Sequence, residues 1–390
     1  MVKKTYFAMV VYSHYSRDAR VRRYAESLVR NGFRVDVVCL NEEYRPKERN
    51  ISLLRYPLGR RRYGKLWYIL EYLLFFLYCT FILSINHLIK RYKVIHINNM
   101  PDFLVFAAAV PKFFGAKIIL DLHDPMPELY MSKYHDNRNG QMVKLLKWLE
   151  KISIDFADDV ITANPIFKKI FLSRNNISSN KITVILNCPD TRIFRPPKPK
   201  KSDNKYFNLL YMGTVEERFG LDVAIDAFTV LVKRMPNMRF IIIPKLEDEG
   251  KYSMELKNRI RQLKLEKYIL FKSPTPLEQI VKEINQADVG IVLARDGIFT
   301  DSIMPVKLLE FIQMEIPVVA TKTRILGRYF TNRQIYFLKK NTAKEFTQAV
   351  LKLWKDKSLR ENLVSKAKDY LRENNWESEE EKYNSLLTNL

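Results

Sequence analysis

The sequence is poor in the residues that usually build metal centres. Its 390 residues include only three cysteines and five histidines. Cys39, Cys79 and Cys188 lie far apart, without a CxxC pair or a neighbouring histidine cluster. This spacing argues against a zinc site and is typical of a protein in a reducing cytoplasm. We therefore expect no bound metal.

The start of the chain lacks the pattern of a secretory signal. The apolar run at residues 7–12 is too short for a signal core, and polar His14, Arg17 and Asp18 follow it. We interpret this run as the first buried strand of a sheet.

Acidic residues are scarce relative to basic ones. The chain has 43 Asp and Glu against 66 Lys and Arg, which gives a net charge of +23. Such a field attracts phosphates, nucleic acid or the anionic face of a membrane, and charge alone does not choose among them. The hydrophobic content of 47% is enough for substantial cores. The length suggests two domains.

Two stretches of alternating strand-like and helix-like segments predict two doubly wound α/β domains. In the first domain, residues 1–191, a helix is expected to begin near Asp18 and to end at Asn31 and Gly32, and a second β-branched strand follows it and ends at Val38. Its later strands are expected at residues 94–97, 116–120, 159–162 and 182–185. In the second domain, residues 206–370, strands are expected at residues 208–212, 239–243, 269–271, 289–293 and 317–320.

A basic, proline-rich segment at residues 192–205 separates the two domains. It reads RIFRPPKPKKSDNK and has almost no apolar content after Phe194, so we interpret it as a linker. The segment 342–390 has a helical pattern throughout. We expect its last part, residues 371–390, to be a helical tail that packs back across the domain junction.

A 20-residue apolar stretch at residues 66–85 contains one charge, Glu71, and is long enough to span a membrane. A spanning helix would put the first strands and the rest of the same sheet on opposite sides of the bilayer, so we do not expect it to span. It is either buried against the sheet or inserted into the headgroup layer, and basic residues before it favour insertion. The candidate membrane-contacting residues are Arg60, Arg61, Arg62, Lys65, Trp67, Phe75 and Phe76.

The segment DLHDPMPE at residues 121–128 follows a predicted buried strand. His123 and Asp124 therefore fall at the carboxyl end of that strand, where ligands bind in open α/β sheets. His123 is a candidate for contact with a substrate, and the alternative is a histidine that hydrogen-bonds a loop carbonyl. His14, Asp124 and Glu128 are further candidates for binding an acceptor.

Two later clusters could bind an anion. Gly213, Arg218 and Gly220 lie between a predicted strand and a helix, where backbone amides and an arginine can hold phosphate oxygens. The segment TDSIMPVKLLE at residues 300–310 places Lys307 and Glu310 in the first turns of a helix, suited to a phosphate and a ribose diol. Alternatively, Arg218 is a solvated turn residue, and Lys307 and Glu310 are an exposed pair.

These clusters and their order resemble family 4 of the retaining glycosyltransferases over nearly the whole chain. The matching segments are SRDARVRRYAESLVRNGFRVDVV, DLHDPMPE, DDVITAN, VILNCPDTRIF, GTVEERFGLDVAIDAF and PVKLLEFIQMEIPVVAT. The resemblance implies a GT-B fold, with two Rossmann-like domains that face a central cleft and C-terminal helices that cross back. It also implies a nucleotide diphosphate-sugar donor in the C-terminal domain, an acceptor in the N-terminal domain, and a reaction without a metal or other cofactor.

By the same resemblance, His123 lies near the transferred sugar and, with Glu310, is a candidate catalytic residue. Gly213, Arg218 and Lys307 would face the donor phosphates, and Glu310 would bind the ribose. The chain departs from the family in three places. Ser302 replaces the first of two glutamates, Phe219 replaces a lysine, and IIIPKLEDEG replaces a glycine-rich turn.

The expected function is sugar transfer to a lipid-linked intermediate of surface polysaccharide or glycolipid synthesis, on the cytoplasmic face of a membrane. A soluble glycan acceptor is the alternative for the substrate. Other functions left open are a sugar-nucleotide epimerase of the same fold and a non-catalytic protein that binds membrane or nucleic acid. The sequence has no recognised nucleic-acid motif, so we do not expect nucleic acid as a partner.

Overall fold

The computed structural model describes residues 5–59, 64–134, 140–196, 205–245, 250–275 and 277–388. The chain forms two compact units. One comprises Met1–Asn187 together with Glu379–Leu390, and the other comprises Cys188–Ser378. Most of the expected linker, residues 197–204, lies outside the described residues.

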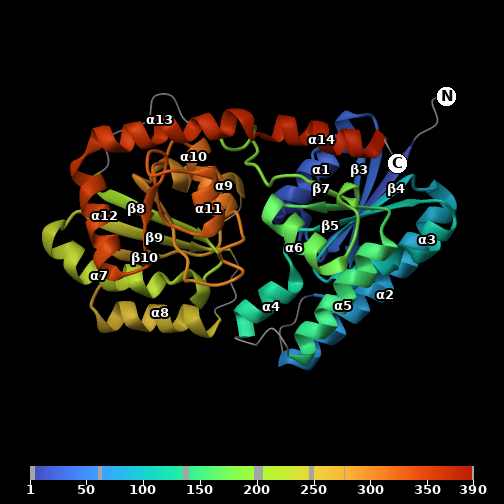
Figure 1. Cartoon of the computed structure of the whole chain (residues 1–390), viewed down its shortest axis with the longest axis horizontal. Helices are drawn as coiled ribbons and strands as arrows, with labels where there is room; N and C mark the ends of the chain where they lie inside the picture. The colour runs from blue at the N-terminus through green and yellow to red at the C-terminus, as the bar shows by residue number, and fades with distance from the viewer. Residues whose placement is uncertain are drawn as a thin grey trace. The chain divides into compact units, whose positions relative to one another are not determined.

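The first unit is built on a seven-stranded parallel sheet with the order β3-β2-β1-β4-β5-β6-β7 (Figure 1). Its strands are β1 (Tyr6–Val10), β2 (Arg34–Leu40), β3 (Ile51–Tyr56), β4 (Val94–Asn98), β5 (Lys117–Leu122), β6 (Asp159–Thr162) and β7 (Ile182–Val184). Its helices are α1 (Ala19–Arg30), α2 (Gly64–Lys90), α3 (Ala109–Phe113), α4 (Met126–Tyr134), α5 (Gln141–Phe156) and α6 (Pro165–Asn175), with 3-10 turns η1 (Tyr15–Arg17), η2 (Asp102–Ala108) and η3 (Ser179–Lys181).

The second unit repeats this plan with a six-stranded parallel sheet in the order β10-β9-β8-β11-β12-β13. Its strands are β8 (Phe207–Gly213), β9 (Met238–Pro244), β10 (Ile269–Phe271), β11 (Val289–Val292), β12 (Val318–Thr321) and β13 (Tyr336–Leu338). Its helices are α7 (Leu221–Arg234), α8 (Lys251–Gln262), α9 (Leu277–Asn285), α10 (Val306–Gln313), α11 (Arg324–Tyr329), α12 (Ala343–Lys355) and α13 (Lys357–Glu373), with the 3-10 turn η4 (Glu217–Phe219).

The first helix shows how local signals fix an element. The side chain of Asp18 accepts a hydrogen bond from the amide of Val21 and so caps α1. The helix ends at Arg30, and Gly32 follows with φ of +82°, a conformation that costs glycine little. Both predicted boundaries of this helix are confirmed.

The expected strands are all present, and the structure adds two that the sequence pattern did not reveal. β3 and β13 lie at the edges of their sheets. Edge strands are buried less completely than central ones, and β3 exposes Ser52 and only partly buries Leu53 and Leu54. The hydrophobic pattern of β3 is correspondingly weak.

The C-terminal segment, expected to be helical throughout, is three separate helices. Asp356 caps α13 by accepting a hydrogen bond from the amide of Leu359, and the last helix is α14 (Trp376–Thr388). From Glu379 onward α14 belongs to the first unit. There Tyr383 is fully buried, with its ring 4.4 Å from that of Tyr24.

Both sheets have the strand order of a doubly wound fold, which reverses direction beside the strand that begins each unit. The reversal falls between β1 and β4 in the first sheet and between β8 and β11 in the second. In such sheets ligands bind outside the carboxyl ends of the strands at this reversal.

Candidate functional site

In the second unit, the end of β8 meets the start of α10. Gly213 ends β8 with φ of +118°, and a Cβ there would lie 3.5 Å from Nζ of Lys307. A side chain at position 213 would therefore strain the backbone, although its Cβ would meet the lysine only at ordinary contact distance. Gly220, with φ of +59°, is similarly constrained, because a Cβ would lie 2.3 Å from Nδ2 of Asn341.

Lys307 extends its ammonium group over aromatic rings. Its Nζ lies 3.7 Å from the ring centroid of Tyr211 and 5.0 Å from that of Phe219, within the range of cation–π attraction. Burial lowers the pKa of Lys307 to about 7; Glu310 opposes this shift and Arg218 adds to it. A bound anion would stabilise the charged form of Lys307 and so raise this pKa.

Arg218 lies beside Lys307 on the turn between β8 and α7. Its guanidinium pairs with Glu216 and stacks over the rings of Phe219 and Phe299, at 5.1 and 5.5 Å from their centroids. Its Nε is buried without a hydrogen-bond partner, and such donors are uncommon in folded proteins. The Arg218 side chain is therefore largely buried and keeps an unused hydrogen-bond donor at Nε, so Arg218 is not a solvated turn residue.

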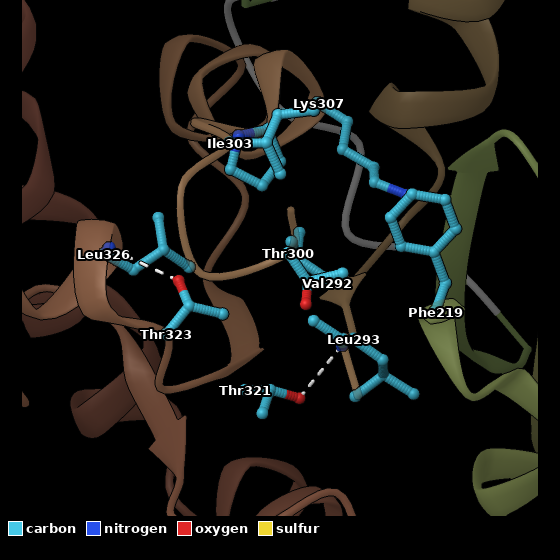
Figure 2. Close-up of a pocket in the computed structure, with 11 residues that line it drawn as sticks. Phe219, Val292, Leu293, Thr300, Ile303, Lys307, Thr321, Thr323 and Leu326 are labelled. Carbon is cyan, nitrogen blue, oxygen red and sulfur yellow. Dashed lines mark hydrogen bonds between the residues drawn. The ribbon is translucent and has the colours of Figure 1, made fainter. Parts of the chain in front are cut away.

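The first turn of α10 has no side-chain cap. Pro305 occupies the N-cap position with an extended backbone, so the first amides of the helix are not satisfied by a capping side chain. Figure 2 shows a pocket beside this turn, with the Lys307 side chain reaching toward the ring of Phe219. The pocket is also lined by the end of β11 and by Thr300, Ile303, Thr321, Thr323 and Leu326.

Glu310 and Ser302 occupy different environments. Glu310 lies on α10, is half-buried and is close enough to Lys307 to influence its pKa. Ser302 is buried, and its hydroxyl donates to the carbonyl of Ile298 at 2.8 Å. Ser302 therefore holds the loop before α10 together, which a glutamate at this position would not do in the same way.

In the first unit, His123 follows β5 and is held at both its backbone and its ring. Its amide donates to Oδ1 of Asn99 at 2.8 Å. Its Nε2 lies 3.2 Å from Oδ1 of Asn98 and 3.4 Å from Oδ2 of Asp121. The ring is partly exposed, and these contacts are with the side chains of Asn98 and Asp121, whereas the alternative interpretation expected a loop carbonyl.

Asp121 is fully buried beneath His123 and pairs with an arginine from α1. Arg20 donates to both of its carboxylate oxygens, from Nε at 2.8 Å and from Nη2 at 3.1 Å. Burial by itself would raise the pKa of Asp121, but Arg20 and His123 hold that pKa well below its usual range. Asp121 is therefore an anion, and its charge is compensated inside the unit.

The three acceptor-side candidates lie in different settings. His14 precedes η1 and is half-buried, and Asp124 is half-buried with its carbonyl accepting from Nδ2 of Asn99 at 3.0 Å. Glu128 is buried on α4, where it accepts from Nη1 of Arg174 at 2.8 Å. Glu128 is therefore held in an internal ion pair with Arg174.

The apolar stretch forms α2, which has two different faces. Its inner face is buried at every fourth residue and includes the one charge of the stretch, Glu71, which accepts from the hydroxyl of Tyr12 at 3.3 Å. Phe75 belongs to this inner face and is fully buried, so its placement among the membrane-contacting residues is wrong. Phe76 is half-buried and Trp67 is exposed. Arg60, Arg61, Arg62 and the side chain of Lys65 lie outside the described residues.

The outer face of α2 is apolar and exposed along its length. Its exposed side chains include Ile69, Leu73, Leu77, Phe81 and Leu88. By length and composition alone, Ile69–Lys90 is the one helix in the described part of the chain that could cross a membrane, and 22% of its most apolar window is buried. Neither of the two interpretations of the stretch is complete, because one face is buried and the other is open.

Among the described residues, no group of three or more His, Cys, Asp and Glu side chains is placed to hold a metal ion. Comparison with known families covers most of the chain. Residues 19–192 match Glycosyltransferase Family 4, and residues 193–370 match Glycosyl transferases group 1. The chain belongs to the family 4 glycosyltransferases.

A curated relative agrees with this family, and two solved structures share the fold. The capsular polysaccharide biosynthesis glycosyltransferase CapM of Staphylococcus aureus is 24% identical over 269 residues, a match that covers 62% of this chain and 66% of CapM. A sucrose-phosphate synthase from Thermosynechococcus elongatus has a TM-score of 0.78 at 15% identity, covering 99% of both chains. HepE from Anabaena, in complex with UDP and glucose, has a TM-score of 0.74 at 14% identity, covering 98% of this chain and 99% of HepE. These likenesses confirm the predicted GT-B fold.

The sequence left several residues of these sites undetected. Asp121 is a charged residue near the end of an otherwise apolar strand, KIILDL, and that mismatch was an available signal. Its partner Arg20 lies 101 positions earlier. Asn98 and Tyr211 are ordinary strand residues in the sequence, and only the fold brings them to His123 and Lys307.

Proposed function

We propose that this glycosyltransferase-family protein moves a sugar from a nucleotide diphosphate-sugar to an acceptor, with retention of configuration and without a metal. The observation that carries the proposal is the gathering of Lys307, Arg218 and the uncapped start of α10 at the end of β8. Two cations and free helix amides form a positive pocket of the kind that binds phosphates. HepE, which shares the fold, binds UDP and glucose.

Each candidate has a distinct part in this proposal. Lys307 and Arg218 hold the diphosphate, Gly213 lets it approach the backbone, and Glu310 accepts hydrogen bonds from the ribose. His123 contacts the transferred sugar or the acceptor. During transfer the bond from the anomeric carbon to the diphosphate oxygen breaks, a bond forms between that carbon and the acceptor hydroxyl oxygen, and the hydroxyl proton passes to the departing diphosphate. The leaving diphosphate gains negative charge, which the two cations and the helix amides stabilise.

A thermal-shift screen tests the donor site. UDP, GDP, ADP, CMP and their sugars are added to the wild type and to Glu310→Ala. At a ligand concentration of 100 Kd, the matching nucleotide stabilises the fold by about 2.7 kcal/mol. We expect this shift in the wild type and its loss in Glu310→Ala.

Glu361→Ala is the matched control, because Glu361 is an exposed glutamate on α13. It should keep the full shift. If no nucleotide raises the melting temperature of the wild type, the donor site and the transferase proposal both fail.

For the acceptor, we propose a lipid-linked intermediate of surface polysaccharide or glycolipid synthesis. CapM, which acts in capsular polysaccharide biosynthesis, supports a surface glycan. The exposed apolar face of α2 supports a lipid-linked one, because it provides a surface on which the first unit could contact a membrane.

Helices near α2 expose further apolar side chains. Both α2 and α3 pack against η2, as does α5. At the end of α3, Phe113 is 85% exposed and Phe114, which follows it, is also exposed. On α5, Trp148 is exposed among Lys144 and Lys151. Apolar side chains mixed with lysines favour an anionic lipid surface at the cytoplasmic face of a membrane.

Vesicle flotation tests the membrane proposal. At low salt the wild type should float with vesicles that contain anionic lipid. The double variant Leu77→Ser/Phe81→Ser should float less, because both side chains are more than half exposed on α2. Trp354→Ser in the second unit is the control and should float as the wild type does. If the wild type does not float with the vesicles, the membrane proposal fails.

A further inference from the structure

The ring of His123 is held by buried side chains to which the family resemblance gives no role. We infer that Asp121 and Asn98 are positioning residues that keep the proton of His123 on Nε2 and so present Nδ1 to the substrate as a hydrogen-bond acceptor. This inference rests on the proposed function for its catalytic meaning. The position of the proton on the His123 ring can be measured whether or not the proposed function is correct.

Asn98 provides the first constraint, because its amide cannot turn over freely. Its Nδ2 donates to the carbonyl of Val10 at 3.0 Å. The Oδ1 atom must therefore face the other way, toward Nε2 of His123 at 3.2 Å. An amide oxygen only accepts hydrogen bonds, so it requires a proton on Nε2.

Asp121 provides the second constraint and adds charge. Its Oδ2 lies 3.4 Å from Nε2 of His123, and the carboxylate is ionised because Arg20 donates to both of its oxygens. An ionised carboxylate also only accepts. Nε2 thus faces two acceptors, and in the neutral imidazole the lone pair is then left on Nδ1.

The outer parts of the set hold Asp121 in place. Arg20 also donates from Nη1 to the carbonyl of Ile185 at 3.0 Å, which ties α1 to the end of the sheet. On the other side, Nε2 of His96 lies 3.6 Å from Oδ2 of Asp121, and Nδ1 of His96 lies 3.1 Å from the hydroxyl of Tyr383. Burial lowers the pKa of His96, so it is neutral and leaves the Asp121 carboxylate charge to be balanced by Arg20.

The arrangement has a direct chemical consequence. A ring that offers the Nδ1 lone pair can accept a hydrogen bond from a sugar or acceptor hydroxyl, and it can hold that hydroxyl in one orientation. A ring free to rotate or to exchange tautomers would do so only part of the time. Asp121 therefore acts on the substrate through His123 and does not touch it.

NMR of the histidine ring tests the inference in the full-length protein. The chain has five histidines, and the His123 signals are assigned by their loss in His123→Gln. In the wild type we expect a proton on Nε2 of His123 that exchanges slowly with water. In Arg20→Met/Asp121→Leu, which removes both buried charges together, that proton should exchange at least about 10-fold faster, because a charge-assisted hydrogen bond is lost.

Tyr383→Phe is the matched control in the same cluster. It removes the hydroxyl beside His96 but leaves Asp121, Asn98 and His123 intact, so the Nε2 proton should keep its exchange rate. A wild-type proton on Nδ1, or an unchanged Nε2 proton in the double variant, would overturn the inference. If the double variant does not fold, Asn98→Leu provides the same readout with no buried charge left unpaired.

Kinetics separate this inference from the proposed function. With a working donor and acceptor, the double variant should lower kcat by at least about 10-fold, within the range of proton-transfer contributions, and leave KM for the donor nearly unchanged. The thermal shift with nucleotide should also be unchanged. If the wild type binds no nucleotide sugar, the proposed function fails, while the proton measurement still decides the role of Asp121.

Discussion

The two units handle buried charge in opposite ways. At the end of β5 in the first unit, the Asp121 carboxylate is matched by Arg20 and its charge is compensated within the fold. At the end of β8 in the second unit, burial lowers the pKa of Lys307 to about 7. Glu310 opposes this lowering but does not cancel it. Both places lie at the carboxyl ends of parallel strands, so their location alone does not explain the difference.

This contrast separates two tasks. A compensated ion pair fixes a neighbouring side chain in one geometry, as Asp121 does for His123. A cation that the fold leaves incompletely compensated gains free energy when an anion arrives. The first arrangement suits positioning, and the second suits the binding of a diphosphate.

Breaking the compensated pair should have the largest effect. Arg20→Met leaves the Asp121 charge buried without its main partner, and we expect a loss of about 3–5 kcal/mol in unfolding free energy. Urea denaturation measures it. Arg30→Met removes an exposed pair with Glu380 and should cost less than about 1 kcal/mol. Adding Asp121→Leu to Arg20→Met should restore most of the lost unfolding free energy. If Arg20→Met alone is as stable as the wild type, the buried Asp121 carboxylate does not depend on Arg20.

Removing the uncompensated cation should affect binding more than stability. Lys307→Met should weaken nucleotide binding by roughly 10- to 100-fold, equivalent to about 1.4 to 2.7 kcal/mol, and leave the unliganded protein at least as stable as the wild type. Calorimetric titration and thermal denaturation measure the two effects. Lys357→Met, at an exposed lysine on α13, should change neither. A loss of stability without a loss of affinity would make Lys307 a structural residue.

The pH dependence of binding should follow the lowered pKa of Lys307. Below about pH 7 the ammonium is charged before the ligand arrives, whereas above it a proton must be taken up on binding. Affinity for UDP should therefore fall as pH rises above about 7, by at most tenfold per pH unit. Titrations from pH 6 to 9 measure it. Lys307→Arg, which stays charged, should lose this decline, and an identical pH profile in both proteins would contradict the assignment.

Ser302→Ala should have the smallest effect. Its hydroxyl bonds the carbonyl of Ile298 within the loop before α10, so we expect a stability loss of about 1 kcal/mol. Nucleotide affinity should change less than about twofold. A larger loss of affinity would mean that the pocket uses this hydroxyl directly.

Local patterns predicted most of the secondary structure and the family. Asp18 and Gly32 marked the ends of α1, and apolar runs marked the central strands, because caps and buried strands depend on nearby residues. Edge strand β3 was missed because Ser52 and Arg55 interrupt its apolar run. No comparable signal separates β13 from the equally short edge strands β7 and β10, which were predicted. The apolar stretch that forms α2 was recognised, but the spacing of its apolar residues did not show that Phe75 is buried and Leu77 exposed.

By itself, the sequence determined the two α/β domains, the glycosyltransferase family and the segments that carry the candidate residues. Only the tertiary structure decided what each residue meets. It paired Arg20 with Asp121 across 101 positions and placed Lys307 on the ring of Tyr211. It also held Glu128 against Arg174. The reason is physical: the charge state and orientation of a side chain depend on burial and on partners that are distant in the chain.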